Sequence, residues 1–149
     1  MKNLGLVCVA LVMAVGVAVS VRAAQEESPF ILVQRIGDPP RQYFHLFETS
    51  NAKYTVRNDG LGEVSYRGGR REAFHLKATA KDQVEELYFY EYEGDVLLLY
   101  RTRTSGYLVR LNPRTRKITR AVEVNRDFSP PVIREKSAVF EDGAVVRLS

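Results

Sequence analysis

The two histidines of the chain are the side chains best suited to proton transfer near neutral pH. His45 and His75 each lie between aromatic or apolar neighbours in stretches that alternate like β-strands. Neither has a histidine or cysteine at the spacing used by metal sites, so we expect no bound metal. A histidine and a carboxylate could still serve a small hydrolase, because such partners meet in space rather than in sequence. The chain has no G-x-S-x-G motif to expose a nucleophile, so the residues favour binding over catalysis.

Arginine is the second residue type that could do chemistry, because a guanidinium makes paired contacts with carboxylate or phosphate. We expect Arg101 and Arg103 to share one strand face, with Arg120 beside them if the hairpin register permits. Such a surface could bind an anionic polymer, which could be a glycan, a lipid head group or a nucleic acid. The alternative is charge balance against the 18 acidic residues. The candidate anion-binding residues are Arg67, Arg70, Arg71, Arg101, Arg103 and Arg120.

A stripe of tyrosines occupies every second position at Tyr88, Tyr90 and Tyr92. In a strand these three rings lie on one face. The stripe can pack beneath a neighbouring sheet, or it can form an exposed contact surface for a protein or a carbohydrate, since the ring is apolar and its tip polar. Both interpretations stay open from the sequence.

Short strands and tight turns must position these side chains. Asn58-Asp59-Gly60 and Gly94-Asp95 are strong turn signals. Within 96–103, Leu97-Leu98-Leu99 predicts a strand that is buried on both faces. Residues 79–86 are the only helix candidate, of one or two turns, and a loop is the alternative. The pattern therefore predicts an all-β fold: an antiparallel meander of short strands, propeller-blade-like or a small sandwich, after an N-terminal signal helix.

One segment carries a family likeness. Gly106-Tyr107-Leu108-Val109-Arg110-Leu111-Asn112-Pro113-Arg114-Thr115-Arg116-Lys117-Ile118 resembles the blade signature G-x-L-x-x-L-D-P-x-T-G-K-x of quinoprotein-like β-propellers, and the likeness covers residues 95–148. It implies blade-like hairpins. The chain departs from the pattern at Arg116, where the family has glycine, and at Arg120, near its usual tryptophan. It also lacks the paired cysteines and the aspartate metal site of the quinone-using members, so the likeness implies no cofactor.

The first residues predict export. Lys2 precedes an uncharged run over 4–21, and Val21-Arg22-Ala23 offers a cleavage site, so 1–23 is predicted to be a signal peptide. The run is also long enough to remain as a membrane anchor. Removing 23 of the 149 residues leaves 126, which form one cysteine-free, β-rich domain over 24–149. That length holds three blades at most, so a closed ring would need oligomerisation.

These observations together favour an exported protein, periplasmic or secreted from a bacterium, that acts by binding. We expect a protein partner in the cell envelope or outside the cell, or self-association, because the edges of an unclosed meander need cover. Binding of an anionic polymer and hydrolysis by a histidine–carboxylate pair are the alternatives. We expect no cofactor, and contact with a membrane only if residues 4–21 are retained.

Overall fold

The described residues of this protein form three antiparallel β-sheets. The computed structural model describes residues 27–34, 44–66 and 69–149, and within them it contains strands and no helix. Sheet A has the strand order β1 (Ile31–Gln34), β6 (Val84–Tyr92), β7 (Asp95–Thr102), β8 (Gly106–Asn112) and β9 (Lys117–Val124). Sheet B comprises β2 (Phe44–Glu48), β3 (Ala52–Arg57), β4 (Leu61–Tyr66) and β5 (Arg71–His75). Sheet C comprises β10 (Val132–Arg134), β11 (Ser137–Val139) and β12 (Val145–Arg147).

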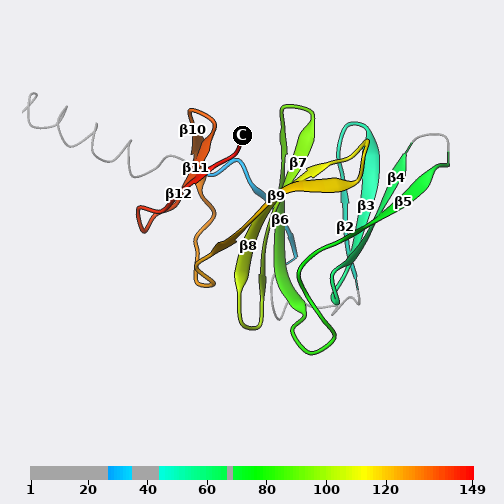
Figure 1. The fold of residues 1–149 in the computed structure, drawn as a ribbon, viewed down its shortest axis with the longest axis horizontal. Coiled ribbons are helices and arrows are strands. Elements are labelled where there is room, and N and C mark those ends of the chain that lie inside the picture. The colour runs from blue at the N-terminus through cyan, green and yellow to red at the C-terminus, as the bar shows by residue number, and fades with distance from the viewer. Residues whose placement is uncertain (1–26, 35–43, 67–68) are drawn as a thin grey trace, which may run out of the picture.

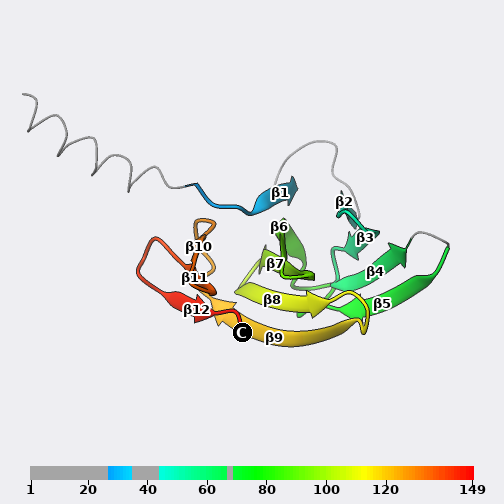
Figure 2. The same ribbon diagram turned by 90° about the horizontal axis from the view of Figure 1, so that it is seen from above.

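The three sheets are stacked, with sheet A between sheet B and sheet C (Figure 1). In each sheet, strands that follow one another in the chain are neighbours. In Figure 2 the strand order of all three sheets runs from the same edge of the stack to the opposite edge. Strand β1 is the exception, because it leaves the N-terminal region to pair with β6. The prediction of an all-β fold of short antiparallel strands is therefore confirmed, and the N-terminal part divides between two sheets.

Two apolar clusters hold the stack together, one on each face of sheet A. Leu98 faces sheet B, whereas Leu97 and Leu99 face sheet C. All three leucines are fully buried, which confirms that β7 is covered on both faces. On sheet B, by contrast, buried and exposed residues alternate along β3. Sheet A is therefore the central layer, and the outer sheets each have one uncovered face.

The turn predicted at Asn58-Asp59-Gly60 is confirmed, whereas the turn predicted at Gly94-Asp95 lies one residue earlier, because Asp95 begins β7. Gly60 has φ 94°, and the β6–β7 hairpin turns through Glu93 at φ 49° and Gly94 at φ 79°. Positive φ at two successive residues is typical of the turn that matches strand twist in a two-residue hairpin. The β10–β11 hairpin does the same with Glu135 at φ 47° and Lys136 at φ 63°, without any glycine.

The helix predicted over 79–86 is wrong: the alternative of a loop holds for residues 79–83, and residues 84–86 belong to β6. The Asp82 N–H donates to Thr79 Oγ1 at 3.0 Å, and the Thr79 N–H donates to the Asp82 carbonyl at 3.1 Å. These bonds close a turn, after which Val84 starts β6. Val84 and Leu87 are both buried, but they belong to a strand that pairs with β7. The segment has too few apolar residues to form the buried face of a helix, so its last residues pair as a strand instead.

The predicted signal peptide over 1–23 lies outside the described residues, so the signal helix and the possible anchor over 4–21 remain predictions. Within the described part, no helix is both long enough and apolar enough to cross a bilayer.

Candidate functional site

The tyrosine stripe lies on the face of sheet A that packs toward sheet C. Tyr88 is buried, and Tyr90 and Tyr92 are partly buried against the same cluster. The Tyr88 ring lies 6.1 Å from Phe128, and the Tyr90 ring lies 5.8 Å from Phe30. The Tyr88 hydroxyl donates to Glu86 Oε1 at 2.7 Å. This placement agrees with the packing interpretation and leaves little tyrosine surface for a partner.

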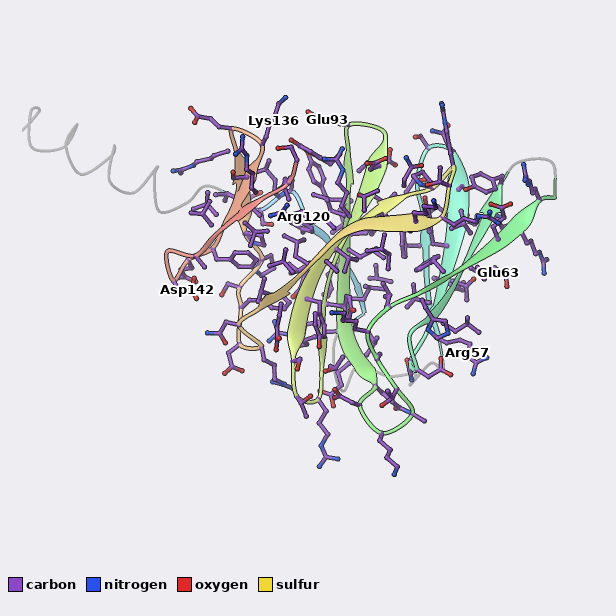
Figure 3. All side chains as sticks on the ribbon, in the orientation of Figure 1. Arg57, Glu63, Glu93, Arg120, Lys136 and Asp142 are labelled. Atoms are coloured by element: carbon purple, nitrogen blue, oxygen red, sulfur yellow. The ribbon has the colours of Figure 1, made fainter. Side chains whose placement is uncertain are left out.

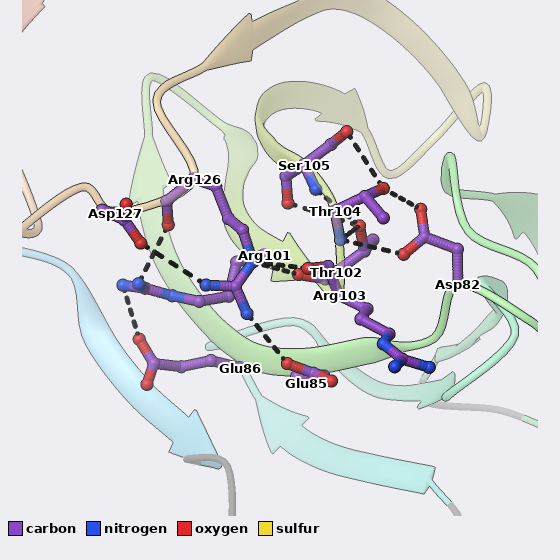
Figure 4. A network of polar contacts seen from close by, with 10 residues as sticks. All are labelled: Asp82, Glu85, Glu86, Arg101, Thr102, Arg103, Thr104, Ser105, Arg126 and Asp127. Atoms are coloured by element: carbon purple, nitrogen blue, oxygen red, sulfur yellow. Dashed lines mark hydrogen bonds and ion pairs between the residues drawn. The ribbon is translucent and has the colours of Figure 1, made fainter.

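Arg101 belongs to a polar network at one end of sheet A (Figure 4). Its Nη2 lies 2.9 Å from Glu86 Oε1, and both side chains are largely buried. It also donates to the carbonyls of Arg126 and Phe128, each at 2.9 Å. Arg126 in turn pairs with Glu85 at 3.1 Å. Arg101 therefore connects the chain after β9 to the central sheet through its two Nη groups, while its Nε is buried without a hydrogen-bond partner among the described residues.

The register separates the other two arginines of the expected cluster. Arg101 lies opposite Gly106 at the start of β8, whereas Arg120, labelled in Figure 3, lies on β9 opposite Arg110 near the end of β8. Arg103 follows the last residue of β7 and is exposed. The three side chains consequently do not form one surface, because the stretch of β8 from Gly106 to Arg110 separates the pairing positions of Arg101 and Arg120.

The structure instead joins two basic clusters that are far apart in sequence. Glu72 on β5 lies between Arg70 Nε at 3.0 Å and Arg116 Nε at 2.6 Å. The Glu72 side chain is only 7% exposed, whereas the side chains of Arg70 and Arg116 are 77% and 41% exposed. Arg71 is exposed and lies 3.7 Å from Glu63, and Arg67 is outside the described residues. We call Arg70, Glu72 and Arg116, with their neighbours Arg71, Arg114 and Lys117, the basic rim.

The basic rim depends on an unusual turn between β8 and β9. Arg116 has φ 57°, the left-handed conformation that glycine adopts most easily. Asn112 Oδ1 accepts from the N–H groups of Arg114 at 3.0 Å and Thr115 at 3.3 Å, and the Arg116 N–H donates to the Asn112 carbonyl at 2.8 Å. The turn therefore imposes the glycine-like geometry at the position where the sequence has arginine, and it directs that arginine toward sheet B.

Tyr66 lies beside the basic rim at the end of β4. Its hydroxyl is buried and has no hydrogen-bond partner among the described residues. Burial, followed by the negative charge of Glu72, raises the pKa of this hydroxyl above its usual range. Tyr66 also lines a depression of about 280 Å³, together with Glu48, Thr49, Ser50, Asn51, Ala52, Lys53 and Ser65. The surroundings of Tyr66 are polar on this side and apolar toward sheet A.

The histidines do not form a visible catalytic pair. His75 is exposed on β5, and no described carboxylate contacts it. His45 belongs to β2, but its side chain is not among those described. Within the described part of the chain, no group of three or more His, Cys, Asp or Glu side chains could hold a metal ion.

The outer face of sheet C is a feature that the sequence reasoning missed. Val132, Val139 and Val145 are cross-strand neighbours in one row. Ile133, Ala138 and Val146 form the row that packs toward sheet A, so the first row points away from the stack. Val145 is 62% exposed. The alternation of residues over 137–139 and 145–147 indicates strands, but it does not show which row of side chains packs against another sheet. We call the row of Val132, Val139 and Val145 the valine face.

Sheet B ends the stack differently. Its outer face pairs Lys53 with Glu48 at 3.5 Å and Arg71 with Glu63 at 3.7 Å. Figure 3 shows Arg57 and Glu63 on this side of sheet B, away from sheet A. Leu46 is exposed there as a single large apolar residue. Charged pairs thus cover one end of the stack, whereas the other end presents a row of valines beside a row of Arg134, Ser137 and Arg147.

No protein-family model, no curated protein and no solved structure matches the chain. The likeness to propeller blades therefore remains a prediction.

Proposed function

We propose that this chain is an exported, non-enzymatic β-protein that binds a protein partner through the valine face of sheet C. The observation that carries this proposal is the row of three cross-strand valines, of which Val145 is 62% exposed, on a sheet whose opposite face is packed. Burial of such a row is favourable in proportion to the apolar area removed from water.

The chemistry of the partner follows from the second outward row of sheet C, which contains Arg134, Ser137 and Arg147. Arg147 is exposed, and it makes no ion pair with any described residue. A complementary surface would place an apolar patch over the valines and a carboxylate beside Arg147. We therefore propose a different protein with an apolar surface and an acidic flank.

The blade-like interpretation is part of the same proposal. Stacked antiparallel sheets in chain order, as seen in Figure 2, support an open array of three blades. In such an array every sheet except the last packs against the sheet that follows it. The outer face of the last sheet therefore has no neighbouring sheet to bury it. The valine face is the surface where that cover is missing.

The test is site-specific photo-cross-linking in the native cells. A photoreactive residue at Val145 should give one defined product with a partner protein, and the same residue at Leu46 should not. Leu46 is the matched control because it is 57% exposed on the opposite end of the stack. The captured protein is then purified, and its binding to the isolated chain should fall at least tenfold with Val139→Lys and remain unchanged with Leu46→Lys.

Two results would contradict this proposal. Identical cross-linked products from positions 145 and 46 would mean that the valine face does not bind a partner specifically. A dimer in sedimentation equilibrium that Val139→Lys abolishes would make a second copy of the chain the occupant in place of a different protein.

A further inference from the structure

The basic rim has an excess of positive charge that the fold does not neutralise. Glu72 is one carboxylate in contact with two guanidinium groups, through the Nε of Arg70 and the Nε of Arg116. Arg114 and Lys117, in the same turn as Arg116, are exposed and make no ion pair with the described residues. Arg70 and Arg116 therefore share the single carboxylate of Glu72, while Arg71 pairs with Glu63 on the outer face of sheet B.

The arrangement also orients the two guanidinium groups. Each contacts the buried carboxylate through Nε, on a different carboxylate oxygen, while the side chains of Arg70 and Arg116 stay 77% and 41% exposed. A planar guanidinium with a free pair of N–H groups binds phosphate or sulfate oxygens with defined geometry. Arg116 adopts this position although its φ of 57° is costly for a residue with a side chain.

We propose that Arg70 and Arg116, oriented by Glu72, form a binding site for a tetrahedral oxyanion, the phosphate or sulfate group of a ligand. Arg114, Arg71 and Lys117 add long-range attraction around this pair. The site lies between sheets A and B, and the valine face lies on sheet C, so this inference is independent of the proposed protein partner.

The test is isothermal titration of the purified chain with two kinds of probe. Inorganic phosphate and sulfate represent a free ion, and heparin octasaccharide and polyphosphate represent ester or anhydride groups repeated along a polymer. Binding should fall about tenfold in Arg116→Lys and in Arg70→Lys, because the charge stays while the paired contact is lost. Arg147→Lys, an exposed arginine on sheet C, is the matched control and should change the affinity less than twofold.

A second variant separates an oriented site from general electrostatic attraction. Glu72→Gln makes the rim more positive but removes the group that holds both guanidinium groups, so the proposal expects weaker binding. Circular dichroism and thermal melting must first show that this variant is folded. If Glu72→Gln does not fold, the two lysine variants decide the question alone.

The outcomes are distinct. Binding of either class of probe with the expected loss in both lysine variants supports the site, and the class that binds more tightly identifies the source of the oxyanion. Tighter binding by Glu72→Gln, or equal losses in Arg116→Lys, Arg70→Lys and Arg147→Lys, would overturn the proposal in favour of net charge. Absence of binding by all four probes would also overturn it. Val139→Lys should leave the titration unchanged.

Discussion

The guanidinium of Arg101 lies 4.1 Å from the centre of the Phe128 ring and donates to the Phe128 carbonyl. Arg101 belongs to β7 in the central sheet, and Phe128 lies in the segment that leads to sheet C. Arg110 makes a similar connection from β8, since it lies 5.1 Å from the Tyr92 ring centre and donates to the Leu148 carbonyl at 2.8 Å. Two arginines thus hold sheet C to sheet A, one before β10 and one after β12.

Arg101→Ala should destabilise the fold by about 3 kcal/mol, because it leaves the buried Glu86 carboxylate without its cationic partner. Urea unfolding followed by circular dichroism measures the change. Arg103→Ala, an exposed arginine just beyond the same strand, should change the free energy of unfolding by no more than about 0.5 kcal/mol. Equal losses in the two variants would show that the Arg101 network adds little to stability.

Successive leucines of β7 should be equally sensitive to truncation. Leu97→Ala and Leu98→Ala should each cost about 2–5 kcal/mol, because each leaves a cavity in a different apolar cluster. In β3 the effect should alternate, so that Val56→Ala is costly and Thr55→Ala is not. Chemical denaturation of the four variants tests the central position of sheet A. A Leu97→Ala cost as low as that of Thr55→Ala would contradict burial on both faces.

The turn at Arg116 should prefer glycine to alanine. Both substitutions remove the ion pair with Glu72, but only glycine relieves the cost of φ 57°. Arg116→Gly should therefore be more stable than Arg116→Ala by about 1 kcal/mol. Arg114 is the control in the same turn, because its φ is not positive and alanine should equal or exceed glycine there. The same ranking at both positions would argue against a left-handed Arg116.

The stability of the protein should fall in alkali. Burial raises the pKa of Tyr54 to about 12 from 10.0, and burial also raises the pKa of Tyr100. An acid whose pKa is raised in the folded state contributes its full stability below the unfolded pKa and loses it as pH rises through the folded one. The free energy of unfolding should thus decrease between pH 10 and 12. Tyr54→Phe should move the alkaline midpoint upward in a pH titration of circular dichroism, and an unchanged midpoint would exclude Tyr54 as a cause.

Local patterns predicted the strands well because they depend on neighbouring residues. The turn at Asn58-Asp59-Gly60, the hairpin at Gly94 and the doubly buried leucines all follow from residue types and spacing. The helix over 79–86 failed because a capping-like Thr79 and Asp82 can equally close a turn. The local sequence does not distinguish a helix start from a turn here, because the pairing of the flanking strands determines the path of the chain.

The site was harder to predict because it depends on register and on packing between sheets. The sequence predicted Arg70 as an anion-binding residue and marked Arg116 only as a departure from the blade pattern, and the fold brings both to Glu72. Arg101 looked like a ligand-binding residue and is used in the network with Glu86. The valines of sheet C carry an ordinary alternating pattern, and the order of the sheets leaves Val145 exposed and Val132 and Val139 half-buried.

The pairing of β1 with β6 sets an order of events for the growing chain. Ile31 lies opposite Phe89, so the whole of sheet B is synthesised between the two partners. Every other pairing joins strands that are consecutive in the chain and can form early, whereas β1 must wait and close a long loop. Until then an apolar strand has no partner. We therefore expect β1 to be the last strand to gain protection from amide hydrogen exchange during folding and the first to lose it.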